Sequence, residues 1–230
     1  TLAPNICIDY NKELYNIAEV VPNTSAINEK TFILRNRLYK IVEYKIVNST
    51  SYTGSVQIFF YDFADSLEDV YAYIEDNSDF SDEQKIKGIL ALRLPYDFLL
   101  IARYTFTDLR ISIEGNRKLG KQIKGAYIDS DHSSIGLTTY VYKYLFNTYQ
   151  LLISDNEQTL DGYSLWLYGV SSWNRVLVYD IQEDEVICEN LDHESNEILP
   201  WMVHPNLSKK DYILTQEHEC RFYTVLFIMQ

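Results

Sequence analysis

The sequence predicts an α/β (α+β) protein with a mixed, partly parallel central sheet and helices on both faces. Two observations lead to this prediction. In the middle of the chain, over residues 97–180, short apolar runs alternate with segments of helical periodicity, which implies parallel strands joined by right-handed crossovers. Towards both ends, strand-like segments are separated by short polar turns, which is typical of antiparallel pairs.

The N-terminal part contains two expected strands. Residues 1–30 are mixed and polar, and Pro4 and Pro22 interrupt any long element there. Segments 38–47 and 54–63 are rich in β-branched and aromatic residues and are expected to form strands. Because only a short polar stretch separates them, we expect the two strands to pair in antiparallel fashion.

Two helices are expected next. Residues 66–76 carry apolar side chains at helical spacing. Residues 81–94 open with Ser81 and have Gln84 three positions later, a capping-box pattern in which each side chain accepts a hydrogen bond from the other's backbone N–H. Pro95 is expected to end this helix, since a proline disfavours the α conformation in the residue before it.

The central segment alternates strands and a helix. Residues 97–106 form a nearly continuous apolar run, predicted to be a buried strand, and 109–114 form another strand. Residues 123–129 and 150–154 are also predicted strands, and 134–147 form an amphipathic helix between them. We therefore expect 123–129 and 150–154 to be parallel neighbours joined by that helix.

The C-terminal part begins with a predicted helix over 159–170. Residues 175–180 and 185–190 flank a polar turn and predict a hairpin. The tail 191–220 is polar and predicts a long loop, and 221–229 is a strongly apolar strand.

Composition narrows the classes of function. A net charge of −13 and a single short basic run, residues 116–124, argue against binding to nucleic-acid phosphates. No apolar run could span a bilayer, and the N-terminal residues lack the pattern of a secretory signal. Three widely spaced cysteines, Cys7, Cys188 and Cys220, fit reduced thiols, so a cytoplasmic protein is expected. The 20 tyrosines, with many Asn, Ile, Lys and Asp residues around them, are typical of AT-rich coding DNA, as in many phages and low-GC bacteria. If the protein is viral, the expected location is the host cytoplasm.

The segment 128–138, IDSDHSSIGLT, leads from a predicted strand into a predicted helix. It aligns without a gap to the loop V-D-P-E-Y-R-G-K-G-I-G of the GNAT family of acetyl-CoA-dependent N-acyltransferases, which the chain resembles best over residues 97–190. In that family, backbone amides at the start of the helix hold the cofactor pyrophosphate, helped by the helix dipole. The resemblance implies an acetyl-CoA site formed by Ile128, Ser133, Ser134, Ile135, Gly136, Leu137 and Thr138.

Two positions depart from the family pattern. Ser133 stands where the family has a basic or glutamine side chain, and Thr138 stands where it has a small residue. Hydrogen bonds to charged groups contribute about 1.5–3 kcal/mol, so loss of a cationic side chain weakens the expected cofactor site. In the alternative interpretation, Gly136 only allows the helix to pack closely on the sheet.

The segment 151–169 continues the resemblance. In GNAT proteins this strand diverges from its parallel neighbour and leaves a slot for pantetheine, and a tyrosine of the next helix protonates the departing thiolate. Trp166 replaces that tyrosine here, and an indole cannot act as a general acid near neutral pH. The resemblance leaves Tyr163 or Tyr168 as the candidate acid.

The candidate general bases are two aspartates. Asp155 follows the predicted strand 150–154, at the sheet edge where ligands of α/β proteins bind. Asp131 lies in the predicted cofactor loop. Either could accept a proton, directly or through water. The alternative role of Asp155 is to cap the following helix.

Two hypotheses of function follow from the sequence. The chain is expected to be a single GNAT-like domain over 1–230, with a core at 97–190, an N-terminal extension at 1–96 and a C-terminal extension at 191–230. It is either an N-acetyltransferase that uses acetyl-CoA and no metal, or a non-catalytic GNAT-like pseudoenzyme, such as an acidic phage protein, that binds a protein partner. The preserved loop length favours the enzyme, and Ser133 and Trp166 favour the binding protein. The acyl acceptor and the oligomeric state are left open.

Overall fold

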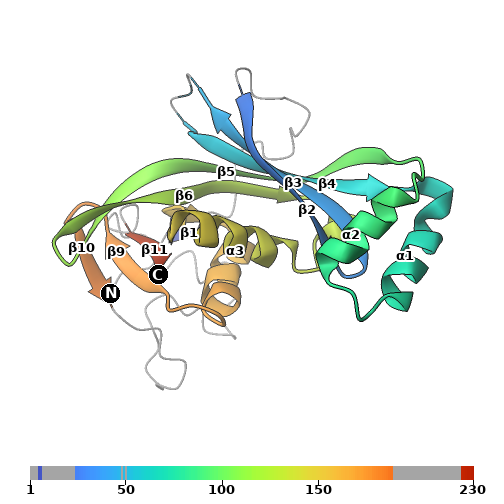
Figure 1. Cartoon of the computed structure of the whole chain (residues 1–230). Coiled ribbons are helices and arrows are strands. Elements are labelled where there is room, and N and C mark those ends of the chain that lie inside the picture. The colour runs from blue at the N-terminus through green and yellow to red at the C-terminus, as the bar shows by residue number, and fades with distance from the viewer. Residues whose placement is uncertain (1–4, 7–23, 48, 50, 189–223) are drawn as a thin grey trace. The chain divides into compact units, whose positions relative to one another are not determined.

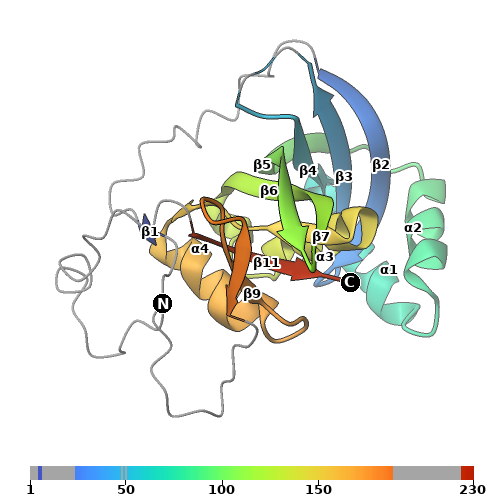
Figure 2. The ribbon, with the colours of Figure 1, turned by 90° about the vertical axis from the view of Figure 1, so that its left-hand side faces the viewer.

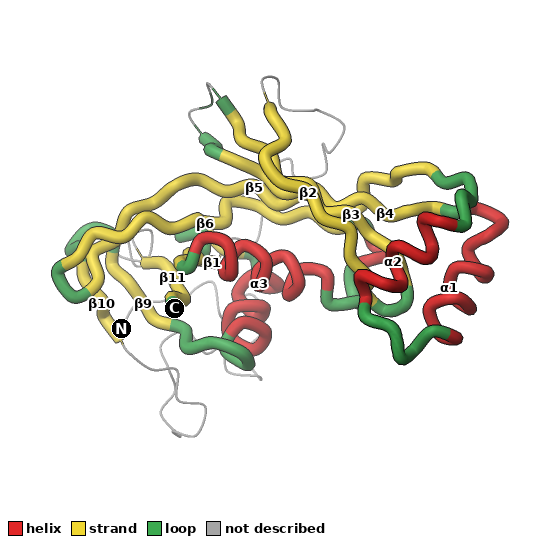
Figure 3. Tube along the Cα trace, in the orientation of Figure 1, coloured by secondary structure: helices red, strands yellow, loops and turns green. Residues whose placement is uncertain are grey.

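The computed structural model describes residues 5–6, 24–47, 49, 51–188 and 224–230 (Figure 1). Residue contacts group the chain into two compact units. Unit 1 comprises Thr1–Lys12, Thr107–Lys124 and Thr139–Gln230. Unit 2 comprises Glu13–Phe106 and Gly125–Thr138. Strands predominate over helices in the described part of the chain (Figure 3).

Unit 2 is built on an antiparallel sheet. Its strands are hydrogen-bonded in the order β5-β4-β3-β2 and are β2 (Thr24–Leu34), β3 (Arg37–Ile46), β4 (Gly54–Asp62) and the first part of β5 (Asp97–Ile113). The strands predicted over 38–47 and 54–63, and their antiparallel pairing, are confirmed. β2 is missing from the sequence prediction because residues 25–30 are exposed on both faces and give no apolar alternation.

Two helices of unit 2 confirm the predicted periodicity. α1 (Leu67–Asp76) and α2 (Asp82–Ala91) follow a short 3-10 turn, η1 (Ala64–Ser66). The buried side chains of both helices pack with Phe63 and part of the sheet in one apolar cluster, which consists of Leu38, Tyr61, Phe63, Val70, Ile74 and Ile89.

The capping box of α2 is present as predicted. Ser81 N–H donates to Gln84 Oε1 at 2.9 Å, and Gln84 N–H donates to Ser81 Oγ at 3.3 Å. The helix ends at Ala91 instead of residue 94, and Arg93 adopts a positive φ of 55°. The chain therefore leaves the helical conformation before it reaches Pro95.

β5 is one long strand, where the sequence predicted two over 97–106 and 109–114. The prediction that 97–106 is buried is wrong at its start, since Phe98 and Leu99 are each 45% exposed. β6 ends at Ile128, and the following Asp129 N–H donates to Ile101 O at 2.8 Å. Residues 97–100 thus lie beyond the end of β6 and, among the described residues, have no strand on that side. The apolar side chains of 97–106 predict burial but do not show where the neighbouring strand ends.

The sheet of unit 1 has the order β10-β9-β11-β7-β6-β5, and Figure 2 shows β11 between β7 and β9. Its further strands are β6 (Asn116–Ile128), β7 (Leu151–Ile153), β9 (Leu177–Asp180), β10 (Glu185–Cys188) and β11 (Thr224–Met229). The β9–β10 hairpin is confirmed, and the strand predicted over 221–229 is confirmed from Thr224 onward. Residues 189–223, including the predicted loop 191–220, lie outside the described residues.

The predicted crossover is confirmed at the centre of the chain. β6 and β7 are parallel, with Lys121 opposite Leu152 and Gln122 opposite Ile153, and α3 (Leu137–Tyr149) connects them. β6 begins at Asn116, seven residues before the predicted strand, because the basic run forms its first half. Gly120 permits the close approach of β7, since a Cβ there would lie 2.6 Å from Leu151 Cγ.

The helix predicted over 159–170 consists of two pieces. These are α4 (Leu160–Ser164) and a π-helix, η3 (Leu165–Val170). Thr159 caps α4, because its Oγ1 accepts a hydrogen bond from Gly162 N–H at 3.0 Å. A small separate pair joins β1 (Asn5–Ile6) to β8 (Glu157–Gln158).

The expected fold class is therefore correct only at its coarser level. The protein is mixed α/β, but its large sheet is mostly antiparallel and contains one parallel pair. The expectation of helices on both faces is wrong, because the described residues are mostly sheet. The early strands β2 to β5 pair antiparallel with short turns or the α1–α2 segment between them, which requires no crossover.

Candidate functional site

The most polar part of the core of unit 1 lies where the backbone pairing of β6 with β7 ends. Backbone pairing between the two strands covers two registers and ends at Gln122 and Ile153. The next residue, Ser154, bonds instead to β11: its N–H donates to Leu226 O at 2.7 Å, and Leu226 N–H donates to Ser154 Oγ at 2.9 Å. The chain after β7 therefore follows β11, and β6 continues without it.

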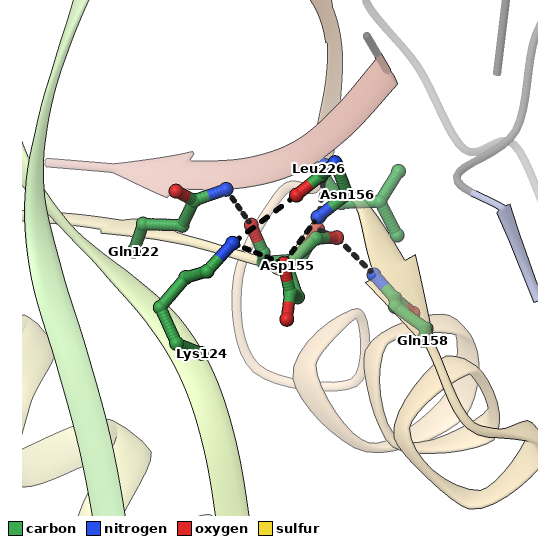
Figure 4. A network of polar contacts seen from close by, with 7 residues as sticks. Gln122, Lys124, Asp155, Asn156, Gln158 and Leu226 are labelled. Atoms are coloured by element: carbon green, nitrogen blue, oxygen red, sulfur yellow. Dashed lines mark hydrogen bonds and ion pairs between the residues drawn. The ribbon is translucent and has the colours of Figure 1, made fainter. Parts of the chain in front are cut away.

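Two side chains of β6 contact the residues that follow β7 (Figure 4). Gln122 Nε2 donates to Ser154 O at 3.1 Å. Lys124 Nζ contacts Asp155 Oδ1 at 2.5 Å and Asn156 Oδ1 at 3.2 Å. Gln122 and Lys124 are two residues apart on a strand, so both side chains leave the same face. They replace the backbone hydrogen bonds that a longer parallel ladder would have made.

Asp155 is 7% exposed and lies at the centre of this network. Its Oδ1 also accepts a hydrogen bond from Asn156 N–H at 2.9 Å, and its backbone O accepts one from Gln158 Nε2 at 3.2 Å. Gln158 is 4% exposed, and its Oε1 has no hydrogen-bond partner within the described ranges. The site thus contains the Lys124–Asp155 ion pair and four further polar side chains, those of Gln122, Ser154, Asn156 and Gln158, of which the Gln158 Oε1 could accept another hydrogen bond.

The sequence predicted Asp155 but not its partners. The prediction that Asp155 caps the following helix is wrong, since Thr159 caps α4. Lys124 belongs to the run that the sequence identified only as basic, and Gln122 belongs to the same run. The available signal was their spacing of two residues, which places both side chains on one face of a strand.

The other predicted catalytic side chains lie elsewhere. Asp131 is exposed in the 3-10 turn η2 (Ser130–His132), which belongs to unit 2, whereas Asp155 belongs to unit 1. Tyr168 lies in η3 and is 61% exposed. Tyr163 lies in α4, and its side chain is outside the described part. Trp166 is buried, with its ring centroid 5.9 Å from that of Tyr142.

The predicted cofactor loop runs from the end of β6 to the start of α3. Ile128 is the last residue of β6, Ser133 Oγ donates to Ser130 O at 2.9 Å, and Ser134 is exposed. Ser133 is also exposed, so its hydroxyl closes a local turn at the surface.

The second half of the loop begins the helix three residues later than the sequence predicted. Ile135 is half-buried, Gly136 has a φ of +89°, and Leu137 is the first residue of α3 and is buried. Thr138 Oγ1 lies 3.0 Å from Tyr104 Oη. A Cβ on Gly136 would meet nothing within 4 Å, so this glycine is required by its backbone conformation and not by close packing on the sheet.

His132 is a buried polar residue that the sequence did not single out as a core residue. Its ring packs on Phe60 and Tyr39, at centroid distances of 5.3 Å and 6.0 Å. Neither ring nitrogen has a hydrogen-bond partner among the residues described, and Nδ1 lies 3.7 Å from Asp129 Oδ1, beyond hydrogen-bond length. Burial lowers the pKa of His132 below 6.5, as does nearby Arg37, and Asp129 and Asp131 oppose this shift.

This burial predicts a pH-dependent stability. Because the folded-state pKa of His132 is lowered, the unfolded chain binds the proton more readily than the folded chain does. The free energy of unfolding is therefore expected to fall as the pH drops below about 6.5 and to level off below the folded-state pKa. Urea unfolding between pH 5 and 8 measures this, with His132→Gln as the comparison. An equal slope over this range in both proteins would contradict the prediction.

Comparison of the chain with protein-family models, with curated proteins and with solved structures finds no match in any of the three. In the described residues, no helix is both long and apolar enough to cross a membrane. Within the same residues, no three His, Cys, Asp or Glu side chains are grouped so that they could hold a metal ion. His218 and Cys220, which the sequence shows at a spacing unsuited to a metal site, lie outside the part described.

Proposed function

We propose that this protein is a GNAT-like N-acyltransferase that moves an acetyl group from acetyl-CoA to an amine. The observation that carries the proposal is that the parallel pairing of β6 and β7 ends after Gln122 and Ile153, whereas β6 continues to Ile128. In the family that the sequence resembles, the corresponding separation takes the pantetheine of the cofactor. A buried carboxylate, Asp155, lies at this position, two residues after the carboxyl end of β7 and in contact with Lys124 of β6.

The proposed roles follow from these positions. Asp155 accepts the proton of the attacking amine, directly or through a water molecule. Lys124 holds the Asp155 carboxylate in place through its 2.5 Å contact. The backbone amides from Ser133 to Thr138 are the proposed ligands of the cofactor pyrophosphate, and the positive φ of Gly136 shapes this loop. For the acid that protonates the thiolate, the solvent exposure of Tyr168 favours Tyr163.

A second candidate function is that of a non-catalytic GNAT-like protein that binds a protein partner. The observation that favours it is a pair of side chains, Gln122 and Lys124, whose hydrogen bonds to Ser154 and Asp155 join β6 to the residues after β7. In this alternative the polar network only holds β6, β7 and β11 together. The two candidates differ in one measurable property, which is the affinity for coenzyme A.

A gain-of-function variant tests the proposal. Ser133→Arg restores the cationic side chain that the family carries, at an exposed position where the larger side chain can be accommodated. We expect it to strengthen acetyl-CoA binding by about 1.5–3 kcal/mol, or about 10- to 150-fold, through a charge-assisted bond to phosphate. Calorimetry measures the affinity, and thiol release with a mixture of polyamines and peptides measures turnover.

Ser130→Arg is the matched control, because Ser130 is also an exposed serine, in the neighbouring turn η2. An equal gain from both arginines would indicate general attraction of the anionic cofactor and not a defined cradle. If neither the natural protein nor Ser133→Arg binds acetyl-CoA, the acyltransferase proposal fails and the binding-protein alternative stands.

A further inference from the structure

A second site lies in unit 1, between two hairpin turns. The β5–β6 turn contains Glu114 and Gly115, and the β9–β10 turn ends at Asp184. Tyr179 and Ser112 join the two turns. Ser112 N–H donates to Tyr179 Oη at 2.8 Å, Ser112 Oγ donates to Asp184 Oδ2 at 2.6 Å, and Tyr179 Oη donates to Asp184 Oδ1.

A cavity of about 610 Å³ lies between these turns and the end of β11. This volume is within the range of about 300–1,000 Å³ that is usual for small-molecule sites. The apolar part of its lining comes from Ile113, Leu177, Val186 and Met229. The cavity can therefore bury an aliphatic group, which is favourable because it removes apolar surface from water.

The charges around the cavity are mostly negative. Its lining includes three carboxylates, Glu114, Asp184 and Glu185, and one guanidinium, Arg175, and a second guanidinium, Arg117, acts electrostatically on Asp184. Hydrogen bonds from Ser112 and Tyr179 lower the pKa of Asp184, so this carboxylate stays ionised. Glu114 and Glu185 are exposed, and the described ranges contain no ion pair for either side chain. An anionic ligand is disfavoured by this excess, and a cation is favoured.

We propose that this cavity binds an alkylammonium group, with the aliphatic chain against the apolar lining and the ammonium head at the carboxylates. The ligand is either a free aliphatic amine or the side chain of a lysine, since both present the same chemistry. The site is separate from the Lys124–Asp155 network: Met229 pairs with Leu151 at the start of β7, whereas Asp155 follows the end of β7. The proposal is therefore independent of the proposed acyl transfer.

Methionine methyl resonances test the proposal in the full chain. The sequence has 2 methionines, Met202 and Met229, so ¹³C-methyl labelling gives two signals, and Met229→Leu assigns the one in the cavity. Titration with n-hexylamine, which is protonated at pH 7 like a lysine (pKa about 10.4), is expected to shift the Met229 signal in a saturable way. The neutral analogue n-hexanol is expected to bind several-fold more weakly. Added salt should reduce the amine affinity, because the head group is solvent-accessible.

Three variants locate the head group. Glu114→Gln and Glu185→Gln are each expected to weaken hexylamine binding about two- to five-fold, the usual range for exposed ion pairs. Glu183→Gln is the matched control, since Glu183 is an exposed neighbour in the same turn and does not line the cavity. The hexylamine affinity of Glu183→Gln should equal that of the natural protein. Equal binding of amine and alcohol, equal losses in all three variants, or no saturable shift would each overturn the proposal.

The source of the ammonium group is distinguished by a second titration. Spermidine represents free amines, and an Nα-acetyl-lysine amide represents a lysine side chain of a protein. Tighter binding of spermidine would indicate that the natural ligand is a free amine. Tighter binding of the lysine amide would indicate that the natural ligand is a lysine of a basic protein partner. If spermidine, the lysine amide and hexylamine all fail to bind, the proposed alkylammonium site is refuted.

Discussion

Lys124→Met is expected to lower the free energy of unfolding by about 3 kcal/mol. The methionine keeps the length of the aliphatic stem but leaves the Asp155 carboxylate without the ammonium group that contacts it at 2.5 Å. Removing one partner of a buried ion pair costs about 3–5 kcal/mol, because the remaining charge is left uncompensated in a low-dielectric site. We place the effect at the lower end, since the Lys124 side chain is partly exposed. Equilibrium urea unfolding measures the change.

Lys40→Met is the matched control for this prediction. The Lys40 side chain is about as exposed as that of Lys124, and its Nζ lies 2.8 Å from Glu29 Oε2. Its partner is 64% exposed, so water can solvate the Glu29 carboxylate once the lysine is gone. The expected loss is about 1 kcal/mol or less. The double variant Lys124→Met/Asp155→Leu should recover most of the stability lost in the single variant. Equal losses for Lys124 and Lys40 would show that the Asp155 carboxylate is solvated.

Asp155→Asn is expected to lower the rate of acetyl transfer by about 10²- to 10⁴-fold, the usual contribution of a general base. Asparagine has the same shape but cannot accept the amine proton. The affinity for acetyl-CoA should change little, because this affinity depends on the phosphate loop. Thiol release at saturating acetyl-CoA measures the rate, and thermal unfolding verifies that the variant is folded at the assay temperature.

Two variants serve as controls for the catalytic prediction. Asp131→Asn tests the other candidate base, which is exposed in η2, and Tyr168→Phe tests the candidate acid that is exposed on η3. Both are expected to retain nearly the full rate. A large loss in Asp131→Asn together with an active Asp155→Asn would transfer the role of base to Asp131. Full activity in all three variants would refute the proposed mechanism.

Local chemistry explains which parts of the fold could be predicted from the sequence. The capping box at Ser81 and Gln84 and the parallel pairing of β6 with β7 depend on short-range patterns, and both are confirmed. β2 could not be predicted, because its residues 25–30 are exposed on both faces and its pairing is determined by β3. The exposed start of β5 could not be predicted for a similar reason, because it depends on where the neighbouring strand β6 ends, which is set by tertiary structure.

The candidate site shows the same limit. Asp155 could be found because it follows an apolar strand, and ligands bind at such ends. Lys124 and Gln122 precede it by about thirty residues, and only the parallel register of β6 and β7 brings them to Asp155. The single-domain organisation and the role of residues 133–138 in cofactor binding stay predictions. The carboxylates around the second cavity lie on two distant turns, so no local motif could have indicated them.

The position of β11 has a consequence for the order of events during synthesis. β11 lies between β7 and β9, although Ser154 and Leu226, which bond to each other, are 72 residues apart in the chain. Until residues 224–229 leave the ribosome, β7 and β9 have no strand between them, and each offers an unpaired edge. Exposed edges of this kind recruit other chains. Pairing between distant parts of the chain also slows folding. We therefore expect the nascent chain to be prone to aggregation until β11 is in place. β2, β3 and β4 of unit 2 pair with neighbours in sequence, so they do not wait for a distant strand.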